Sequence, residues 1–286
     1  MKRLLLGSLC LMLSCVALAA GPSEVRKQAQ AGMLVTGLIE VTPEGKVKSF
    51  ALDQQSKLPA PVVELLGENI PTWEFKPVVD DGKPVAAKAK MNLRIVAKRV
   101  DDQHSSISIE GAQFGENTNQ SGETITRKTM EQPKYPPLEI ASRVSGTVYL
   151  LLRVGRNGQV EDAAAEQVNL GVYASERDMD RFRNDLADAA LKAARQWTFN
   201  TPTVGKHIND DYWVARAPVA FNIILRGASP PHDEYGKWQS YIPGPRELVP
   251  WLDKSRLMSG SPDAAPSDGV YQVGQGLQLI TPLAGA

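Results

Sequence analysis

The sequence predicts an α+β fold made of two small repeated units. Two observations lead to this prediction. A hairpin with a turn glycine, an apolar helix and a Trp-x-Phe motif follow one another twice, in residues 37–77 and again in residues 146–202. Each copy then ends in an alternating strand, over residues 89–96 and 214–225. An internal repeat of this kind divides a long chain into small supersecondary units.

The first unit covers residues 33–97. Residues 34–41 and 46–52 predict a hairpin, because the Thr-Pro-Glu-Gly segment between them supplies a glycine for the turn. Residues 58–73 place apolar side chains on one face at helical spacing, which predicts a helix. A strand over residues 86–97 completes the unit.

The polar segments outside the repeat are interpreted as connections. Residues 98–131 are rich in Gly, Ser, Asn and Gln, and we expect a linker there with one short strand at 106–109. Residues 227–286 form a Pro- and Gly-rich C-terminal tail, with a hairpin around Gly274-Gln-Gly276. Whether this tail packs on the two units stays open at this stage.

The second unit covers residues 132–226 and contains a short helix at 138–143. Its hairpin joins residues 147–154 to 159–168 through Asn157-Gly158, a strong two-residue turn signal.

The second unit's long helix, residues 176–197, begins at Ser175 with Asp178 in a pattern that resembles a capping box. It ends at Trp197, as the helix of the first unit ends at Trp73. Because each Trp-x-Phe continues the buried stripe of its helix, we interpret both tryptophans as core residues. The alternative is a ligand-stacking platform.

Residues 1–20 have the features of a signal peptide. Two basic residues precede an apolar run over residues 4–16, and Ala17-Leu-Ala19 is a small-x-small cleavage site. The run is shorter than the roughly 20 residues that a membrane-spanning helix needs. We therefore expect cleavage, a periplasmic location and no transmembrane segment in the processed chain.

Both cysteines of the chain, Cys10 and Cys15, lie inside this leader. Cleavage would remove every thiol, which excludes disulfides, cysteine nucleophiles and thiolate metal sites. The residues before Cys15 match a lipoprotein processing site poorly, so a lipid anchor at Cys15 is the less favoured alternative.

The remaining residues give no pattern typical of a catalytic, metal or nucleic-acid site. Thirty-two basic and thirty-two acidic residues balance, and no basic stripe offers a surface for nucleic acid. His104, His207 and His232 stand apart, without the spacing of metal ligands. Three Asp-Asp pairs lie in turn-like stretches, where Asp bonds its own backbone; calcium there is a weaker alternative. We expect no catalytic residue, no metal and no cofactor.

The order and spacing of motifs in residues 132–226 resemble the C-terminal domain of TonB. The matching motifs are Gln132-Pro133-Lys-Tyr135-Pro136, Gly146-x-Val148, Asn157-Gly158-x-Val160, Trp197-x-Phe199 and Pro218-Val-x-Phe221. The first unit is similar from its hairpin onward and lacks the opening motif. The resemblance implies two tandem TonB-like units, each with helices packed on a small antiparallel sheet.

In that family the domain pairs an exposed strand with a short extended peptide of an outer-membrane receptor. The resemblance therefore implies an outer-membrane receptor or another envelope protein as partner. It implies the following partner-binding residues: Gln132, Pro133, Tyr135, Pro136, Val214, Arg216 and Pro218. Strand addition suits this role, because an exposed edge offers unpaired N–H and C=O groups.

Pro218 supports an edge position for residues 214–225, since proline has no N–H for a central strand. The competing outcome is that the first unit, or tail residues 278–281, already covers this edge.

The chain also departs from the family. A TonB transducer keeps an N-terminal helix in the inner membrane and has a long Pro-rich spacer, whereas this chain has a cleavable leader and no such spacer. The favoured function is a non-enzymatic periplasmic binding or adaptor protein, with a link to TonB-dependent transport as an extension. The alternatives are an envelope hydrolase with a site between the two units and the tail, and a lipid-anchored structural protein.

Export of the chain in its native host is expected to remove residues 1–19 or 1–20, because the short apolar run ends in small residues. The intact mass of the exported form measures this directly. A retained N-terminus would restore the transducer interpretation, and a diacylated Cys15 would make the protein a lipoprotein.

Overall fold

The computed structural model describes residues 21–100, 105–117, 122–223, 234–249, 251–252, 261–267 and 269–283. The expected leader with Cys10 and Cys15 lies outside these residues, as do His104, His232, Asp101-Asp102 and the last two residues of the expected strand 214–225. In the described part of the chain, no helix combines the length and the apolar character needed to cross a membrane.

The first sheet is antiparallel and has the strand order β12-β1-β5-β6, with β2 also paired to β1. Its strands are β1 (Gln30–Val41), β2 (Val47–Leu52), β5 (Ala87–Arg99), β6 (Ser105–Asn117) and β12 (Gln239–Tyr241). The helix α2 (Ala60–Asn69) and the 3-10 turn η2 (Ile70–Thr72) contribute buried residues to the core on one side of this sheet.

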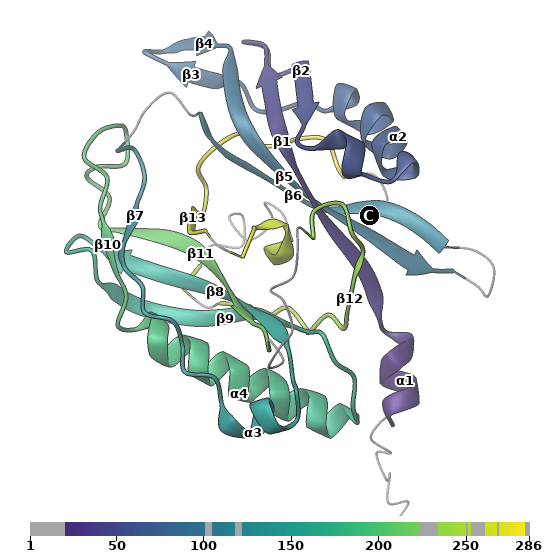
Figure 1. Cartoon of the computed structure of the whole chain (residues 1–286). Coiled ribbons are helices and arrows are strands. Elements are labelled where there is room, and N and C mark those ends of the chain that lie inside the picture. Colours follow the sequence, from purple (N-terminus) through teal and green to yellow (C-terminus); the bar gives the residue numbers. More distant parts are fainter. Residues whose placement is uncertain are drawn as a thin grey trace, which may run out of the picture.

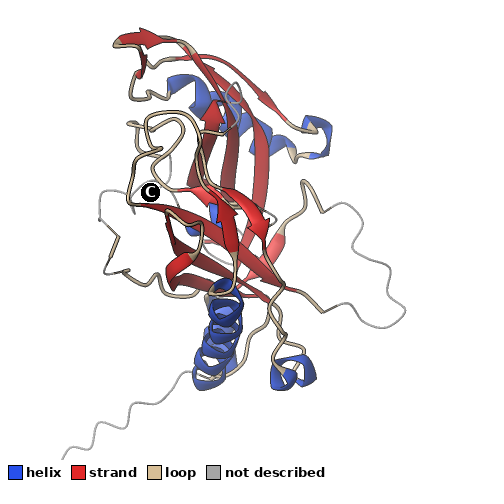
Figure 2. Cartoon of the chain, turned by 90° about the vertical axis from the view of Figure 1, so that its left-hand side faces the viewer, coloured by secondary structure: helices blue, strands red, loops and turns tan. Residues whose placement is uncertain are grey.

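The second sheet is also antiparallel, with the order β13-β11-β8-β9. Its strands are β8 (Gly146–Gly155), β9 (Val160–Leu170), β11 (Tyr212–Phe221) and β13 (Tyr271–Gln272). The long helix α4 (Glu176–Ala194) packs on this sheet, and Figure 2 shows it end-on with the short helix α3 (Pro137–Ala141) at its side.

Smaller elements complete the fold. They are α1 (Pro22–Lys27), η1 (Gln55–Lys57), the β3–β4 ladder (Val78–Asp80, Lys83–Val85), the β7–β10 ladder (Thr126–Thr129, Thr198–Asn200) and η3 (Pro262–Ala264). The buried Val25 of α1 packs into the core of the second unit, although β1 directly after it belongs to the first sheet.

The two sheets lie between their helices. Figure 1 shows α2 beside the first sheet, α4 beneath the second, and the C-terminal segment running between the two sheets. Each sheet buries one row of side chains against its helix, such as Leu93 in β5 and Leu150 in β8. Arg94 and Tyr149 are direct neighbours of these residues in their strands. Because strand side chains alternate, both lie on the opposite faces of their sheets. These two faces are turned toward each other.

Both halves contain the same turn contact. Gly45 and Gly158 follow the first strand of their hairpins with φ of 85° and 75°. The N–H of Phe75 donates to the carbonyl of Gly45 (2.7 Å), and the N–H of Phe199 donates to the carbonyl of Gly158 (2.8 Å). Each Phe belongs to a Trp-x-Phe motif, so the chain after each helix is held against the turn of its own hairpin.

The expected core positions of the two tryptophans are confirmed. Trp73 is 2% exposed and Trp197 is 3% exposed. Trp197 also donates its Nε1–H to the carbonyl of Glu131 at 2.8 Å, which holds the chain just before the Gln132-Pro133 opening of the second unit.

The expected linker at residues 98–131 is wrong in part, because the short strand expected at 106–109 belongs to a longer strand and a second strand follows it. Residues 105–117 form β6, which pairs with β5 from Ala89 to Arg99, and residues 126–129 form β7. Polar composition concealed an alternating row of apolar residues in β6: Ile107, Ile109, Ala112 and Phe114, all of which join the first core. A β-bulge, marked by a register shift beside Ile109, keeps Ala112 and Phe114 on the core side.

The C-terminal tail packs on both sheets, and the hairpin expected around Gly274-Gln-Gly276 does not form. Residues 271–273 pair with β11, whereas Leu279 pairs with Phe75 of the first unit. The two arms of the expected hairpin therefore bond to different halves of the molecule, one to the strand β11 and the other to the segment around Phe75.

Gly158→Ala is expected to destabilise the protein distinctly more than Gly82→Ala. Both glycines have φ of 75°, so either alanine costs about 1–2 kcal/mol of backbone strain. A Cβ at Gly158 would in addition lie 2.1 Å from the carbonyl oxygen of Phe199, whereas a Cβ at Gly82 meets nothing within 4 Å. Urea unfolding of both variants measures the difference, and equal losses would contradict the turn contact.

Candidate functional site

The strand of the second sheet that follows α4, β11, is buried on both of its faces from Trp213 to Val219. Ala215 and Ala217 face the core beneath the sheet with α4. Val214, which is 2% exposed, packs on the opposite face with Leu151, Val249 and Leu252. The side chains from Trp213 to Val219 therefore face the interior, whereas those of Tyr212 and Ala220 are exposed. Between these two residues, only the backbone edge of β11 can be offered to a partner.

The outer edge of β11, on the side away from β8, is covered along a short stretch. Ala215 pairs with Gln272 and Arg216 with Tyr271, and the N–H of Val273 donates to the carbonyl of Val214 at 2.7 Å. The backbone groups of Val214 point outward, and those of every second residue do the same in an antiparallel ladder. The outward residues are therefore Tyr212, Val214, Arg216, Pro218 and Ala220.

Pro218 explains why this ladder is short. It is the next outward residue after Arg216, and proline has no N–H to donate to a neighbouring strand. The pairing with β8 continues past it to Phe221, since that side uses the alternate residues. The expectation that Pro218 lies in an edge-type position agrees with this geometry.

The equivalent strand of the first sheet has a complete neighbour. β5 pairs with β1 on one side and with β6 on the other, from Ala89 to Arg99. β11 has β8 on one side, and on the other it has only the two-residue strand β13. The two sheets thus differ most in how far the outer edge of this strand is paired.

The expected binding residues of β11 can meet a partner only through their backbone groups. Val214, Arg216 and Pro218 are all buried, so none of them is presented to the surface. The expected competing cover by tail residues is present, but with residues 271–273 in place of residues 278–281. The latter bond to the first unit between Glu74 and Lys76.

The opening segment of the second unit reaches the end of β11. The ring of Tyr135 packs edge-on against that of Phe221, with the centroids 5.2 Å apart, and its hydroxyl donates to the carbonyl of Val144. Gln132 is exposed, while Pro133 and Pro136 are half-buried. The structure therefore brings Tyr135 beside the candidate edge and leaves Gln132 in solvent.

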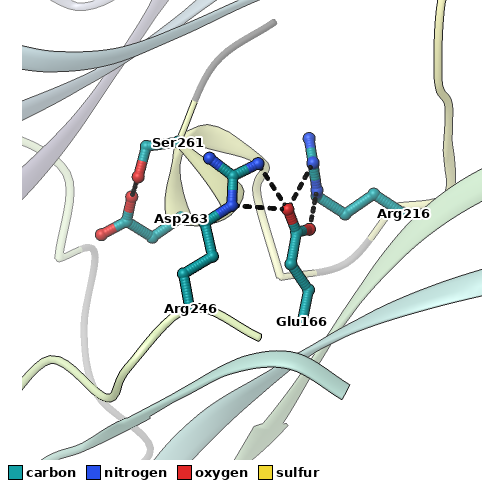
Figure 3. Close-up of polar contacts among 5 residues, drawn as sticks. All are labelled: Glu166, Arg216, Arg246, Ser261 and Asp263. Atoms are coloured by element: carbon teal, nitrogen blue, oxygen red, sulfur yellow. Dashed lines mark hydrogen bonds and ion pairs between the residues drawn. The ribbon is translucent and has the colours of Figure 1, made fainter. Parts of the chain in front are cut away.

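Arg216 belongs to a buried ion-pair cluster that the sequence did not indicate (Figure 3). Glu166 of β9 is 0% exposed, and its Oε2 accepts from Nε of Arg216 at 2.8 Å. Arg246 donates from Nη2 to Oε1 of the same carboxylate at 2.6 Å. Because β8 lies between β9 and β11, this cluster ties two non-adjacent strands to the C-terminal segment. Removing one partner of such a buried cluster is costly, which makes Arg216 structural.

A second polar cluster joins the facing sides of the two sheets. Nε of Arg94 in β5 lies 3.2 Å from Oδ2 of Asp263 in η3, and its guanidinium stacks 4.7 Å from the centroid of Tyr241 in β12. Burial raises the pKa of Tyr241 to about 12, and burial likewise raises the pKa of Tyr149 in β8. Both phenols stay neutral near pH 7, so the cluster is suited to holding the sheets together.

A cavity of about 880 Å³ lies between β6, β11 and the C-terminal segment. It is the place that the alternative, a hydrolase, would need. Its described lining contains no histidine or cysteine, and Ser261 donates its hydroxyl to Asp263. The described residues also contain no group of three or more His, Cys, Asp or Glu that could hold a metal. We assign no reaction to this cavity.

Comparison with known proteins gives a partial match. No protein-family model and no solved structure matches the chain. Two curated proteins, both called Protein TonB and from two strains of Xanthomonas campestris pv. campestris, are 39% identical to it over 101 residues. That stretch is 35% of this chain and 38% of each relative, so the chain covers well under half of the relatives' length.

This similarity supports a TonB-like domain in the chain. The matched stretch is too short to contain both units, which together extend from residue 33 to residue 226. A periplasmic or envelope location is compatible with the match.

Glu139 gives the opening segment a pH-dependent contact. This α3 residue is 1% exposed, and burial, followed by a hydrogen bond with Asp185 of α4, raises the pKa of its carboxyl above 4.5. Arg181 acts in the opposite direction on this pKa. The folded chain therefore holds this proton more tightly than the unfolded chain, and the contact weakens as the pH rises through the raised pKa.

Glu139→Gln is expected to remove this pH dependence. In the unmodified protein the contribution of Glu139 to the free energy of unfolding should fall as the pH rises above 4.5 and through the raised pKa of its carboxyl, and this part of the slope should be missing in the variant. Urea unfolding at a series of pH values measures it, with the exposed Glu68→Gln as the control. Equal slopes for Glu139→Gln and the unmodified protein would contradict the assignment.

Proposed function

We propose that this chain is a non-enzymatic periplasmic binding or adaptor protein. In this proposal, two tandem TonB-like units form its body, and the second binds an extended segment of another envelope protein by strand addition. The observation that carries the proposal is the unequal pairing of the outer edges of β5 and β11. β5 has a full-length outer neighbour in β6, whereas β11 has only β13.

The proposal of two units rests on contacts that occur in both halves. In each sheet the first hairpin strand is central, the second lies on one side and the strand after the helix lies on the other. The glycine-to-Phe hydrogen bond and the buried tryptophan recur as well. In this view β6 occupies, on the first unit, the position that a partner strand would take on the second.

The bound segment would run antiparallel to β11, as β6 runs to β5. Its first residues would then lie near Phe221 and Tyr135, and its last near Tyr212. Since the outward groups of β11 are backbone groups, recognition would depend on an extended conformation more than on particular side chains. Pro218 has no N–H, so a carbonyl of the bound segment would find no hydrogen-bond donor at this position. This favours segments that do not depend on a hydrogen bond there.

The partner class follows from the similarity to Protein TonB and from the leader-like N-terminus. An outer-membrane receptor or another envelope protein is proposed, with a link to TonB-dependent transport. The described chain offers no arrangement typical of catalysis, and strand addition needs none. Energy transduction is not part of the proposal.

Ala220→Pro is expected to weaken partner binding without unfolding the protein. The Ala220 N–H points to the outer edge, so its loss removes one hydrogen bond to a partner strand and leaves the β8 pairing intact. One net bond of about 0.5–1.5 kcal/mol corresponds to a roughly 2- to 10-fold loss of affinity. Envelope proteins that bind the unmodified processed chain are captured, identified and titrated against both forms.

Two controls make this test specific. Thermal unfolding checks that Ala220→Pro keeps its stability, and Lys48→Pro, in the exposed strand β2 of the first sheet, checks for a general effect of edge prolines. Hydrogen exchange of residues 212–221 should slow when the captured partner is added. A partner that binds both forms equally and leaves this exchange unchanged would rule out β11 as the site.

A further inference from the structure

The C-terminal segment that covers β11 has two halves, and one of them is firmly attached to the first unit. Leu277 is 8% exposed and belongs to the first core. The N–H of Lys76 donates to the carbonyl of Gln278 at 2.9 Å, and the N–H of Ile280 donates to the carbonyl of Glu74 at 2.8 Å. Residues 277–281 are thus fixed by backbone bonds and by burial together.

The other half, residues 271–273, is attached to the second sheet, where Val273 packs against the cluster of Leu151, Val214, Val249 and Leu252. It forms a ladder of two residue pairs with β11, and the N–H of Val273 donates to Val214. Outside this ladder, the side-chain oxygen of Gln272 accepts from the N–H of Ile125 at 3.0 Å. Pro218 prevents the ladder from growing, because the next outward position of β11 has no donor.

Two glycines separate these halves. Gly274 and Gly276 have φ of 85° and 82°, a region that residues with side chains rarely adopt. A Cβ at Gly276 would lie 2.1 Å from the carbonyl oxygen of Phe114, so this glycine is packed against β6. A Cβ at Gly274 would meet nothing within 4 Å. The backbone can therefore change direction at Gly274 while Gly276 and the anchored half stay in place.

We infer that residues 271–273 form a latch, hinged at Gly274, that closes the outer edge of β11 in the absence of a partner. This inference rests on the proposed function of that edge. Val214 and Arg216 are the central outward residues of β11, and the latch bonds to both. A partner strand cannot pair with three consecutive outward residues that include them unless the latch leaves. The latch would also protect an exposed edge from unspecific strand pairing.

A latch lowers the apparent affinity for any partner strand, since only the unlatched fraction of molecules can bind. Val273→Pro removes the donor to Val214 and is expected to open the latch. Val273→Ala keeps this donor and is the matched control. The amides of Val214 and Arg216 should exchange faster in Val273→Pro than in Val273→Ala or the unmodified chain, as measured by NMR on the processed full chain.

A reversible lock tests the closed state in the same molecule. Ala215 and Gln272 lie directly opposite each other across the ladder, at the spacing at which cysteines can form a disulfide. Residues 21–286 contain no other cysteine. The double variant Ala215→Cys/Gln272→Cys should therefore be latched when oxidised and free to open when reduced.

The binding probe is a fluorescent synthetic peptide with the sequence of residues 269–275 of this chain. It should bind Val273→Pro about tenfold more tightly than it binds Val273→Ala. The oxidised double variant should not bind it, and reduction should restore binding. This combination of results, with the faster exchange of Val214 and Arg216, supports the latch.

Two other outcomes separate the latch from the function that it regulates. Equal peptide binding by Val273→Pro, Val273→Ala and the oxidised variant, with weaker binding of a captured envelope partner to Ala220→Pro, would overturn the latch and keep strand addition at β11. Fast exchange of Val214 and Arg216 in Val273→Pro, with no binding of the peptide or of a captured partner, would overturn strand addition itself and, with it, the role of the latch.

Discussion

Unpaired backbone groups at the sides of the two sheets are the constraint on which the rest of the structure depends. An outer strand carries a row of N–H and C=O groups that need partners in the folded chain. In the described residues the C-terminal segment supplies them to β1 through β12, to Leu170 through Ile242, to Glu166 through Glu247, to β11 through β13, and to Glu74 and Lys76 through residues 278–281. The backbone hydrogen bonds of this one segment are therefore enough to join both halves.

The polar side chains between the sheets follow from the same arrangement. Two sheets that each bury one face against a helix leave their other faces turned inward, and these faces carry charged residues as well as apolar ones. Arg94 is paired with Asp263, and Glu166 is paired with Arg216 and Arg246. A buried charge without a partner would cost several kcal/mol. The ion pairs thus fix where the C-terminal segment can pass.

In this view, the function of the protein depends on the strand edge that the fold leaves incompletely paired, the outer edge of β11. The first sheet closes the side of its last strand with β6, which follows it directly in sequence. The second sheet closes the same side with three residues that come from about fifty positions further along the chain. A short, hinged cover of this kind is easier to remove than a full strand, so a binding edge can exist in a protein that is otherwise closed.

The local signals in the sequence were sufficient for the two repeated hairpins, the helices that follow them and the core tryptophans. Their turn glycines, the cap at Ser175 and the helical spacing before Trp197 involve residues close together in the chain. The tertiary structure alone decided the course of the C-terminal segment and the burial of Arg216. Those features depend on partners far apart in sequence, such as Gln30 with Tyr241 and Glu166 with Arg246. Backbone pairing accepts almost any side chain, so such partners leave no pattern in the sequence until the fold brings them together.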